Sequence, residues 1–343
     1  MNNGMRIFMT LIFSCCCLFS KGQDQLYYVL NADSNRVGVR DEKGTIIIPP
    51  IHNVYHDYVL DVPIDDPFIE FMGVVGHEDA EKDSPAFAVS TVYDRKGNIL
   101  YYPQFFDNGS DYWSEGLRRY VEKGKIGFVN FFGDKISPAN WGFALPFNYG
   151  YATVYVGKMK KQYDTGGEHW FVVPAEAGVN EYIINRHGVR VDPLQERQDP
   201  KDYFYNGAYY PNPFQYNKEE LMILKKLKQF EKAITFLFKL NSHQYEFMPL
   251  QLEIVEKPNR YFPFYVIGAY EEQRRLDDYE ILFDEKSGDF YISQWVSRTE
   301  LVSLNEGLMS SIEDNLQCGM DYIKPETRKL AEQELLKLKT NGK

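Results

Sequence analysis

The sequence has little cysteine, no nucleotide-binding glycine motif and no excess of positive charge. Four of its 343 residues are cysteines, and three of them stand together as Cys15, Cys16 and Cys17. No Gly-x-Gly-x-x-Gly follows a predicted strand and no Gly-Lys-Ser/Thr is present, so nucleotide binding is unsupported and we predict no cofactor. Hydrophobic content of 44% and charged content of 25% are typical of a folded chain.

Residues 1–22 differ in composition from the rest of the chain. Arg6 precedes an apolar run over residues 7–19, and the small residues Ser20 and Gly22 lie just before Gln23. This order is that of a secretory signal peptide, and the run is too short for a membrane-spanning helix of about 20 residues. We therefore predict an exported protein, periplasmic or extracellular in a bacterial envelope, with no transmembrane segment.

The cysteines near the N-terminus leave a second form of export open. The segment Ile12-Phe13-Ser14-Cys15 loosely resembles a lipobox, but Phe13 is bulky and the apolar run continues past Cys15. Free secretion is therefore favoured over a lipid anchor at Cys15.

Cleavage after Gly22 would remove every cysteine but one. Cys318 alone can form neither an internal disulfide nor a cysteine-rich zinc site, and we interpret it as a half-buried, unreactive thiol at the end of a helix. The remaining chain has 36 basic and 49 acidic residues, a net charge of −13. Phosphate backbones require clustered Lys and Arg, so nucleic acid is not an expected partner.

Four segments share one pattern: residues with high strand propensity, Asp or Asn, two further residues, Gly, then a second strand-like run that ends at proline. They are VGVRDEKGTIIIPP (37–50), VSTVYDRKGNILYYP (89–103), KIGFVNFFGDKISP (125–138) and EYIINRHGVRVDP (181–193). The acid or amide side chain suits a turn, and glycine supplies the positive φ that a tight hairpin needs. The pattern predicts β-hairpins with their turns at Gly44, Gly97, Gly133 and Gly188.

The third segment and its lead resemble the WG-repeat family. The lead is Trp113-Ser114-Glu115-Gly116-Leu117, followed by Gly124-Lys125-Ile126-Gly127-Phe128-Val129-Asn130, Gly133, Lys135, Ile136 and Pro138. The resemblance covers about residues 26–195, although Val37 and Ile126 stand where the family has tryptophan. It implies that Trp113, Gly116 and Gly127 are structural repeat residues, as are the four turn glycines. Because such hairpins bury little alone, neighbours must stack.

Residues 201–216, rich in Tyr, Phe, Pro and Asn, predict a linker between the repeat region (23–200) and a C-terminal domain (217–343). In that domain, Asn217 and Glu220 predict a capping box at the start of a helix over 218–240. Further helices are expected near 301–312 and 325–339, and strands near 247–295. The predicted fold is mainly β: an array of antiparallel β-hairpin repeats followed by an α+β part in which helices cover an antiparallel sheet.

Several chemical motifs have simpler structural interpretations. Asp164-Thr165-Gly166 matches an aspartic-protease tripeptide but has no second copy, which indicates a polar turn. His52 and His56 are four residues apart but follow two prolines, so a helical metal site is not expected, and no metal site is predicted.

The aromatic linker is the best candidate for a binding surface. Its candidates are Tyr203, Tyr205, Tyr209, Tyr210 and Phe214, which could contact a protein or glycan, or instead join the two parts of the chain.

No catalytic residue set emerges, so we predict a non-enzymatic exported binding or scaffold protein whose ligand and oligomeric state the sequence does not identify. The alternative is a hydrolase of envelope or extracellular polymer, with general acid and base among Glu253, Glu256, Asp277 and Asp278. An inhibitor or immunity-like partner of another secreted protein is a third hypothesis.

Overall fold

The computed structural model describes residues 25–56, 58–76, 83–106, 109–167, 169–240, 250–259, 262–294, 301–318 and 323–341. The predicted signal peptide (1–22) lies outside these residues. The chain forms two compact units, the first from residues up to 75 together with 90–100, and the second from 76–89 together with 101 onwards. The aromatic segment 201–216, predicted as a linker, lies within the second unit.

The first unit is built from antiparallel strands. Strands β1, β2 and β3 form one sheet, and β4 pairs with β5. Their bounds are β1 (Leu26–Leu30), β2 (Arg36–Asp41), β3 (Ile46–Asn53), β4 (Phe68–Met72) and β5 (Ser90–Asp94). Inward-facing strand residues meet in a core of Leu26, Val37, Val39, Ile48, Ile69, Phe71 and Tyr93. Ile64, from the segment between β3 and β4, completes this core.

The repeat-like part of the second unit contains two larger sheets and three short hairpins. Within this unit the last residues of β6 pair with β9, β9 pairs with β10, and β10 pairs with β11; a second sheet has the order β12-β13-β16-β17. The bounds are β6 (Ile99–Pro103), β9 (Leu117–Glu122), β10 (Lys125–Asn130), β11 (Lys135–Trp141), β12 (Phe143–Ala144), β13 (Tyr151–Val156), β16 (Asn180–Asn185) and β17 (Arg190–Val191). The hairpins are β7 (Phe105–Phe106) with β8 (Gly109–Ser110), β14 (Met159–Tyr163) with β15 (Trp170–Pro174), and β18 (Tyr203–Tyr205) with β19 (Ala208–Tyr210).

The four predicted hairpin turns are present and have one geometry. In each, the glycine nitrogen donates to the carbonyl of the Asp or Asn three residues earlier, at 2.9–3.2 Å. The side chain of that Asp or Asn accepts from the backbone nitrogens two and four residues on. The glycines all have positive φ, from 73° to 86°, a conformation that a side chain disfavours. They are Gly44, Gly97, Gly133 and Gly188.

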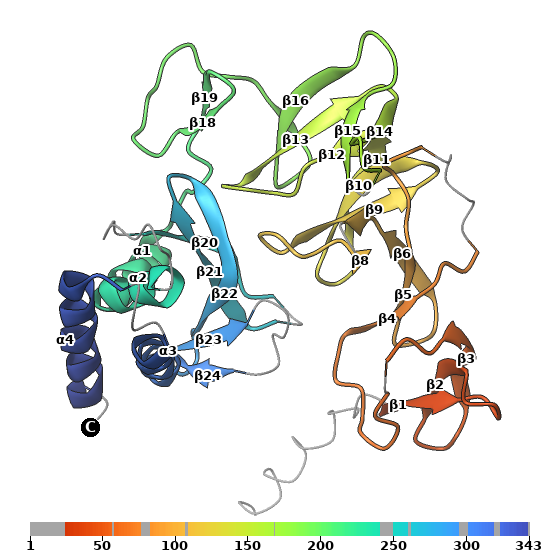
Figure 1. The fold of residues 1–343 in the computed structure, drawn as a ribbon, viewed down its shortest axis with the longest axis horizontal. Coiled ribbons are helices and arrows are strands. Elements are labelled where there is room, and N and C mark those ends of the chain that lie inside the picture. The colour runs from red at the N-terminus through yellow and green to blue at the C-terminus, as the bar shows by residue number, and fades with distance from the viewer. Residues whose placement is uncertain are drawn as a thin grey trace, which may run out of the picture. The chain divides into compact units, whose positions relative to one another are not determined.

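A five-stranded antiparallel sheet forms the C-terminal part of the second unit. Its strand order is β20-β21-β22-β23-β24, which follows the sequence. The bounds are β20 (Gln251–Glu256), β21 (Phe264–Glu271), β22 (Arg274–Asp284), β23 (Asp289–Gln294) and β24 (Val302–Ser303). The helical elements are α1 (Lys218–Leu227), η1 (Lys228–Phe230), α2 (Glu231–Lys239), α3 (Leu304–Cys318) and α4 (Pro325–Asn341), drawn beside the sheet in Figure 1.

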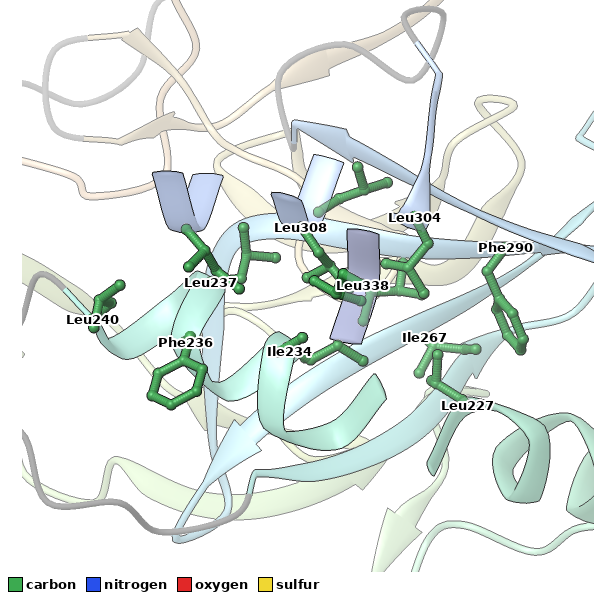
Figure 2. Packing of buried hydrophobic residues seen from close by; sticks show 14 of the residues in the cluster. Leu227, Ile234, Phe236, Leu237, Leu240, Ile267, Phe290, Leu304, Leu308 and Leu338 are labelled. Carbon is green, nitrogen blue, oxygen red and sulfur yellow. The ribbon is translucent and has the colours of Figure 1, made fainter. Parts of the chain in front are cut away.

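The helices cover one face of this sheet. Ile267 and Phe290 from the strands pack with Leu227, Ile234 and Leu308 from the helices in the largest hydrophobic cluster, shown in Figure 2. Successive strand residues point to opposite faces, so the neighbours of these strand residues lie on the other face. That face is also buried, and it carries Val255, Val266, Tyr270 and Leu282.

The mainly β fold with a helix-covered C-terminal sheet is confirmed. The predicted capping box is also present, with Asn217 accepting from the nitrogen of Glu220 and Glu220 accepting from the nitrogen of Asn217. The prediction of a single helix over 218–240 was wrong in one respect, because the 3₁₀ turn η1 divides this segment into α1 and α2. The apolar residues of α1 and α2 nevertheless pack in one hydrophobic cluster. No helix in the described ranges is long and apolar enough to cross a bilayer.

Candidate functional site

Two glycine turns of the repeat part lie against the C-terminal sheet. Glu115 and Gly116 have φ of 53° and 72°, and Tyr149 and Gly150 have φ of 54° and 76°. The flanking residues of each pair exchange two backbone hydrogen bonds, as in the two-residue type I′ turn. A left-handed conformation is strained for glutamate and tyrosine, so surrounding contacts must stabilise both turns.

The side chain of Glu115 supplies part of that stabilisation. It is fully buried, accepts from the Tyr270 hydroxyl at 2.5 Å and accepts from the Gly150 nitrogen at 2.9 Å. Burial, reinforced by the Glu115 carboxylate, raises the pKa of Tyr270 well above its usual range. Glu115 thus joins the two glycine turns to each other and to β21.

Tyr149 enters the same sheet from the second glycine turn. Its hydroxyl accepts from Gln251 at 2.5 Å, and its ring packs edge-on against Phe214 and Tyr270. Next to it, Asn148 donates to the carbonyl of Gln273 at 2.8 Å. The first residue of each glycine turn therefore places a buried side chain on the face of the C-terminal sheet that the helices leave uncovered.

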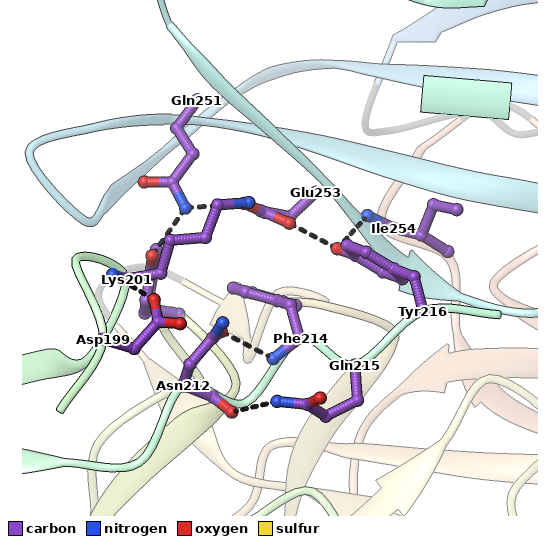
Figure 3. Close-up of polar contacts among 10 residues, drawn as sticks. Asp199, Lys201, Asn212, Phe214, Gln215, Tyr216, Gln251, Glu253 and Ile254 are labelled. Atoms are coloured by element: carbon purple, nitrogen blue, oxygen red, sulfur yellow. Dashed lines mark hydrogen bonds and ion pairs between the residues drawn. The ribbon is translucent and has the colours of Figure 1, made fainter. Parts of the chain in front are cut away.

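Glu253 on β20 is a third buried side chain with several hydrogen bonds. We call Glu115, Tyr149, Glu253 and their hydrogen-bond partners the bonded junction. Glu253 is fully buried and accepts from Lys201, Tyr216 and Gln251, as Figure 3 shows. Burial, followed by the nearby Glu253 carboxylate, raises the pKa of Tyr216. Every one of these donors comes from the protein, so Glu253 is a structural acceptor.

A cleft of about 430 Å³ opens beside this bonded junction. One wall is formed by Gly116 and Gly150 of the glycine turns, and another by residues 254–257 at the end of β20. Side chains at Gly116 or Gly150 would collide with Glu256 or Pro213, since an added Cβ would lie 2.2 Å and 2.6 Å from atoms of those residues. Glycine thus allows the close approach that shapes the cleft.

The middle residues of two repeat turns also line the cleft. Phe131 and Phe132 occupy the central positions of the turn that ends at Gly133, and Arg186 and His187 occupy the same positions of the turn that ends at Gly188. The fixed Asn and Gly of each turn shape the backbone, whereas these two positions project into the cleft. The remaining lining residues are Leu117, Asn130, Ile136, Pro213, Phe214, Gln215, Tyr216 and Asn259.

The ionisable groups of the cleft differ in their partners. Lys257 forms an ion pair with Glu220 at 2.6 Å, and Glu256 has interactions of its own within the protein. Arg186 donates through Nη2 to the carbonyl of Glu115 at 2.5 Å. Its other terminal nitrogen, Nη1, is buried and has no hydrogen-bond partner among the described residues.

The five aromatic residues predicted as a binding surface lie in different environments. Phe214 is buried between the repeats and the C-terminal sheet, and Tyr203 stacks on Tyr149 and Tyr151 from the hairpin β18–β19. The other three, which are Tyr205, Tyr209 and Tyr210, lie half-buried on the same hairpin, whose exposed aromatic residue is Phe204. Of the five, Phe214 alone lines the cleft.

The predicted structural residues of the third repeat lie within its hairpins. Trp113 packs on Phe131 with ring centroids 5.2 Å apart, and the Arg118 guanidinium lies over the Trp113 ring. A Cβ added to Gly127 would lie 2.5 Å from the ring of Tyr120, which packs over it from the neighbouring strand. Gly116, interpreted as part of an apolar lead, instead occupies the second position of a glycine turn.

Other motifs have structural surroundings. His52 lies buried on β3, where it stacks on Phe71 and bonds the hydroxyl of Tyr93, while His56 lies exposed in a bend. Asp164 begins the turn of the hairpin β14–β15. The described residues contain no cluster of His, Cys, Asp and Glu that could hold a metal ion.

Two sequence expectations for single residues need separate comment. Cys318 is exposed at the end of α3, so the expected half burial was wrong; the apolar positions of that helix, such as Leu316, take the core-facing side instead. The side chains of Asp277 and Asp278, proposed as catalytic acids, lie outside the described part of the structure.

The sequence interpretation missed two signals that were available. Asn206-Gly207 between aromatic residues is a strong hairpin signal, and it forms the type I′ turn of β18–β19. Lys123-Gly124, which the sequence analysis did not identify as a turn, forms the turn between β9 and β10. The role of Glu115 had no local signal, because its partner Tyr270 is 155 residues away.

Comparisons with known proteins identify no family. No family model matches the chain, and no curated protein matches its sequence. One solved structure, described as the crystal structure of the eukaryotic initiation factor, aligns with 10% identity over 82% of this chain at a TM-score of 0.14. The alignment covers 51% of that protein, and a TM-score this low carries no argument about fold or function.

Proposed function

We propose that this chain is an exported, non-enzymatic binding protein, with WG-like repeats over about residues 26–195 and its ligand site in the cleft of the second unit. The observation that carries the proposal is the lining of that cleft. The variable central residues of two repeat turns project into it, while the repeated Asn and Gly residues hold the backbone. Variable side chains on a fixed frame are a common way to build a binding site.

The surroundings of the carboxylates favour binding over hydrolysis. Glycoside hydrolysis needs two carboxyl groups on either side of the bond to be broken. Glu115 and Glu253 are fully buried and bonded to protein donors. Among the described side chains, Glu256 is the one carboxylate that lines the cleft.

The bonded junction would keep the cleft in one shape. Glu115, Tyr149 and Glu253 connect the repeats, the segment 201–216 and the C-terminal sheet through buried hydrogen bonds. A preorganised site loses less conformational entropy when a ligand binds. This supports a rigid binding protein whose partner is a protein, a peptide or a glycan.

Site-specific photo-crosslinking tests the cleft without assuming a ligand. A benzophenone amino acid replaces the exposed His187 in the cleft, and in a control it replaces Lys43, the exposed residue at the same position of the first repeat turn. Irradiation of producing cells should give a defined adduct at position 187 and none at 43. No adduct at 187, or the same adducts at both positions, would contradict the proposal.

Export is tested on the same material. Mass spectrometry of the protein recovered outside the cytoplasm should find an N-terminus at Gln23. A protein that retains Met1 in all fractions would contradict export, and a lipid-modified N-terminus at Cys15 would support the anchored form.

A further inference from the structure

Arg186 has one hydrogen-bonded end and one buried end without a partner. Nη2 is anchored on the Glu115 carbonyl, whereas Nη1 is buried with no hydrogen-bond partner in the described structure. A buried charged donor without a partner is costly, and such a group in a native protein calls for an explanation. A ligand oxygen that enters the cleft would supply the missing acceptor.

Other lining residues of the same cleft are apolar or aromatic. Phe131 and Phe132 from the neighbouring turn, Pro213 and Phe214 from the aromatic segment, and Ile254 from β20 line it. These side chains offer no group that would orient a polar ligand, but they favour the burial of an apolar body. The cleft thus combines one unsatisfied cationic donor with an apolar surface.

The other charged groups of the cleft already have partners within the protein, so Arg186 is the group that selects the charge of the ligand. Lys257 is paired with Glu220 and largely exposed, and Glu256 already interacts within the protein. His187, the next residue along the chain, is exposed and also lines the cleft. A carboxylate matches a guanidinium better than any neutral acceptor does, because the hydrogen bonds are charge-assisted.

We propose that the cleft binds a carboxylate attached to an apolar or aromatic body, with the carboxylate at Arg186 and the body against Phe131 and Phe132. This inference rests on the proposed binding function and adds the chemical class of the ligand. Two sources have this chemistry: a free small carboxylic acid, and the C-terminal residue of a protein chain. A volume of about 430 Å³ fits a group of this size.

N-acetyl-phenylalanine and its amide are the matched probes, because they have the same body and differ only in a terminal carboxylate or carboxamide. NMR titration of the full chain from Gln23 onwards should give a Kd on the order of 1 mM for the acid, as expected for a small ligand. The amide should bind about tenfold more weakly. Equal binding of acid and amide would overturn the proposal.

Two substitutions test the charged part and the aromatic part of the cleft separately. Arg186→Gln should abolish the preference for the acid, whereas Phe131→Ala should weaken the acid and the amide by the same factor. The control Arg190→Gln changes an exposed arginine on the same hairpin, whose side chain is paired with Asp192 outside the cleft, and should leave the preference unchanged. The readout is a ratio, so a loss of stability common to both titrations does not alter it. An Arg186→Gln protein that keeps the full preference would overturn the assignment.

A longer probe identifies the source of the ligand. An octapeptide that ends in phenylalanine with a free carboxylate should show the same preference over its amide if the natural ligand is a protein C-terminus. If the octapeptide is excluded while N-acetyl-phenylalanine binds, the natural ligand is a free small acid. Crosslinking at position 187 separates the two proposals: a specific adduct without a preference for the acid contradicts the ligand class alone, and no adduct contradicts the binding site itself.

Discussion

The hairpins β2–β3 of the first unit and β10–β11 of the second have the same internal geometry. In both, the pairing register shifts twice: once across a glycine, Gly38 or Gly127, and once directly after the next residue, Val39 or Phe128. The paired residues are Val37 with His52, Val39 with Ile48 and Arg40 with Ile46 in the first, and Ile126 with Trp141, Phe128 with Ser137 and Val129 with Lys135 in the second. The same bulge in the same register indicates one structural unit used twice.

The two hairpins differ in the central residues of their turns. Glu42 and Lys43 of the first are exposed and charged, whereas Phe131 and Phe132 of the second are half-buried and line the cleft. The frame therefore tolerates charged or aromatic pairs at the same positions. The repeated residues therefore determine the fold, and the two central residues determine what each turn contacts.

The largest expected difference in stability is between a substitution at Glu115 in the second unit and one at Glu42 in the first. Glu115→Ala removes the buried acceptor of Tyr270 and Gly150, and loss of one partner of a buried charged network costs about 3 to 5 kcal/mol. Glu42→Ala, at an exposed turn position of the first repeat, should change stability by less than about 0.5 kcal/mol. Urea unfolding of the full chain measures both, and equal effects would contradict the structural role of Glu115.

The shared bulge predicts that Gly38→Ala and Gly127→Ala are both strongly destabilising, by about 3 kcal/mol. An added Cβ would lie 2.3 Å from the Ile48 carbonyl oxygen at Gly38, and 2.5 Å from the Tyr120 ring at Gly127. The cost should be the larger at Gly38, because backbone cannot move aside. Gly109→Ala is the control, since nothing lies within 4 Å of its added Cβ. If Gly38→Ala melts like Gly109→Ala, the bulge geometry is wrong.

The sequence predicted those features of the fold that depend on residues close together along the chain. Asp41 and Asn130 reveal their turns because their side chains bond nitrogens two and four residues away. Glu220 reveals the helix start for the same reason. Local hydrogen bonding was sufficient for these positions, and the repeated hairpin pattern was sufficient for the mainly β fold class.

The candidate site depends on contacts between distant segments, which the sequence alone does not reveal. Glu115 could be recognised as part of a repeat, but its left-handed conformation follows from Tyr270 on another sheet. The convergence of Phe131 and Arg186 on one cleft likewise follows from how two hairpins pack. Sequence named Phe214, Gly116 and Glu256 among the lining residues, whereas Phe131, Phe132, Arg186 and His187 lie at central turn positions that carried no pattern.

Acid should weaken the first unit through His52. Burial lowers the pKa of His52 to about 4 from its usual value of 6.5, so the folded state favours the neutral ring. Between pH 6.5 and 4 the unfolded chain binds more protons, and the stability conferred by neutral His52 is lost as pH falls through that window. The loss approaches roughly 2 to 3 kcal/mol at pH 4.

A comparison with His52→Phe isolates this effect. The substitution keeps an aromatic ring against Phe71 but cannot be protonated. Denaturant unfolding monitored at pH 7 and pH 4 should show a steeper loss for the parent than for the variant. Parallel losses in the two proteins would assign the acid sensitivity to other groups.

The smallest expected effect isolates backbone conformation in the shared turn. Gly44 has a φ of +86° and nothing within 4 Å of an added Cβ, so a substitution there meets strain without a collision. Gly44→Val should cost about 1 to 2 kcal/mol, because a β-branched residue resists positive φ. Gly44→Asn should cost less, since asparagine tolerates the left-handed region. Thermal unfolding ranks the two variants. A valine variant as stable as the asparagine variant would show that the turn relaxes to negative φ. The shared geometry of the two hairpins would then depend on the bulge and not on the turn.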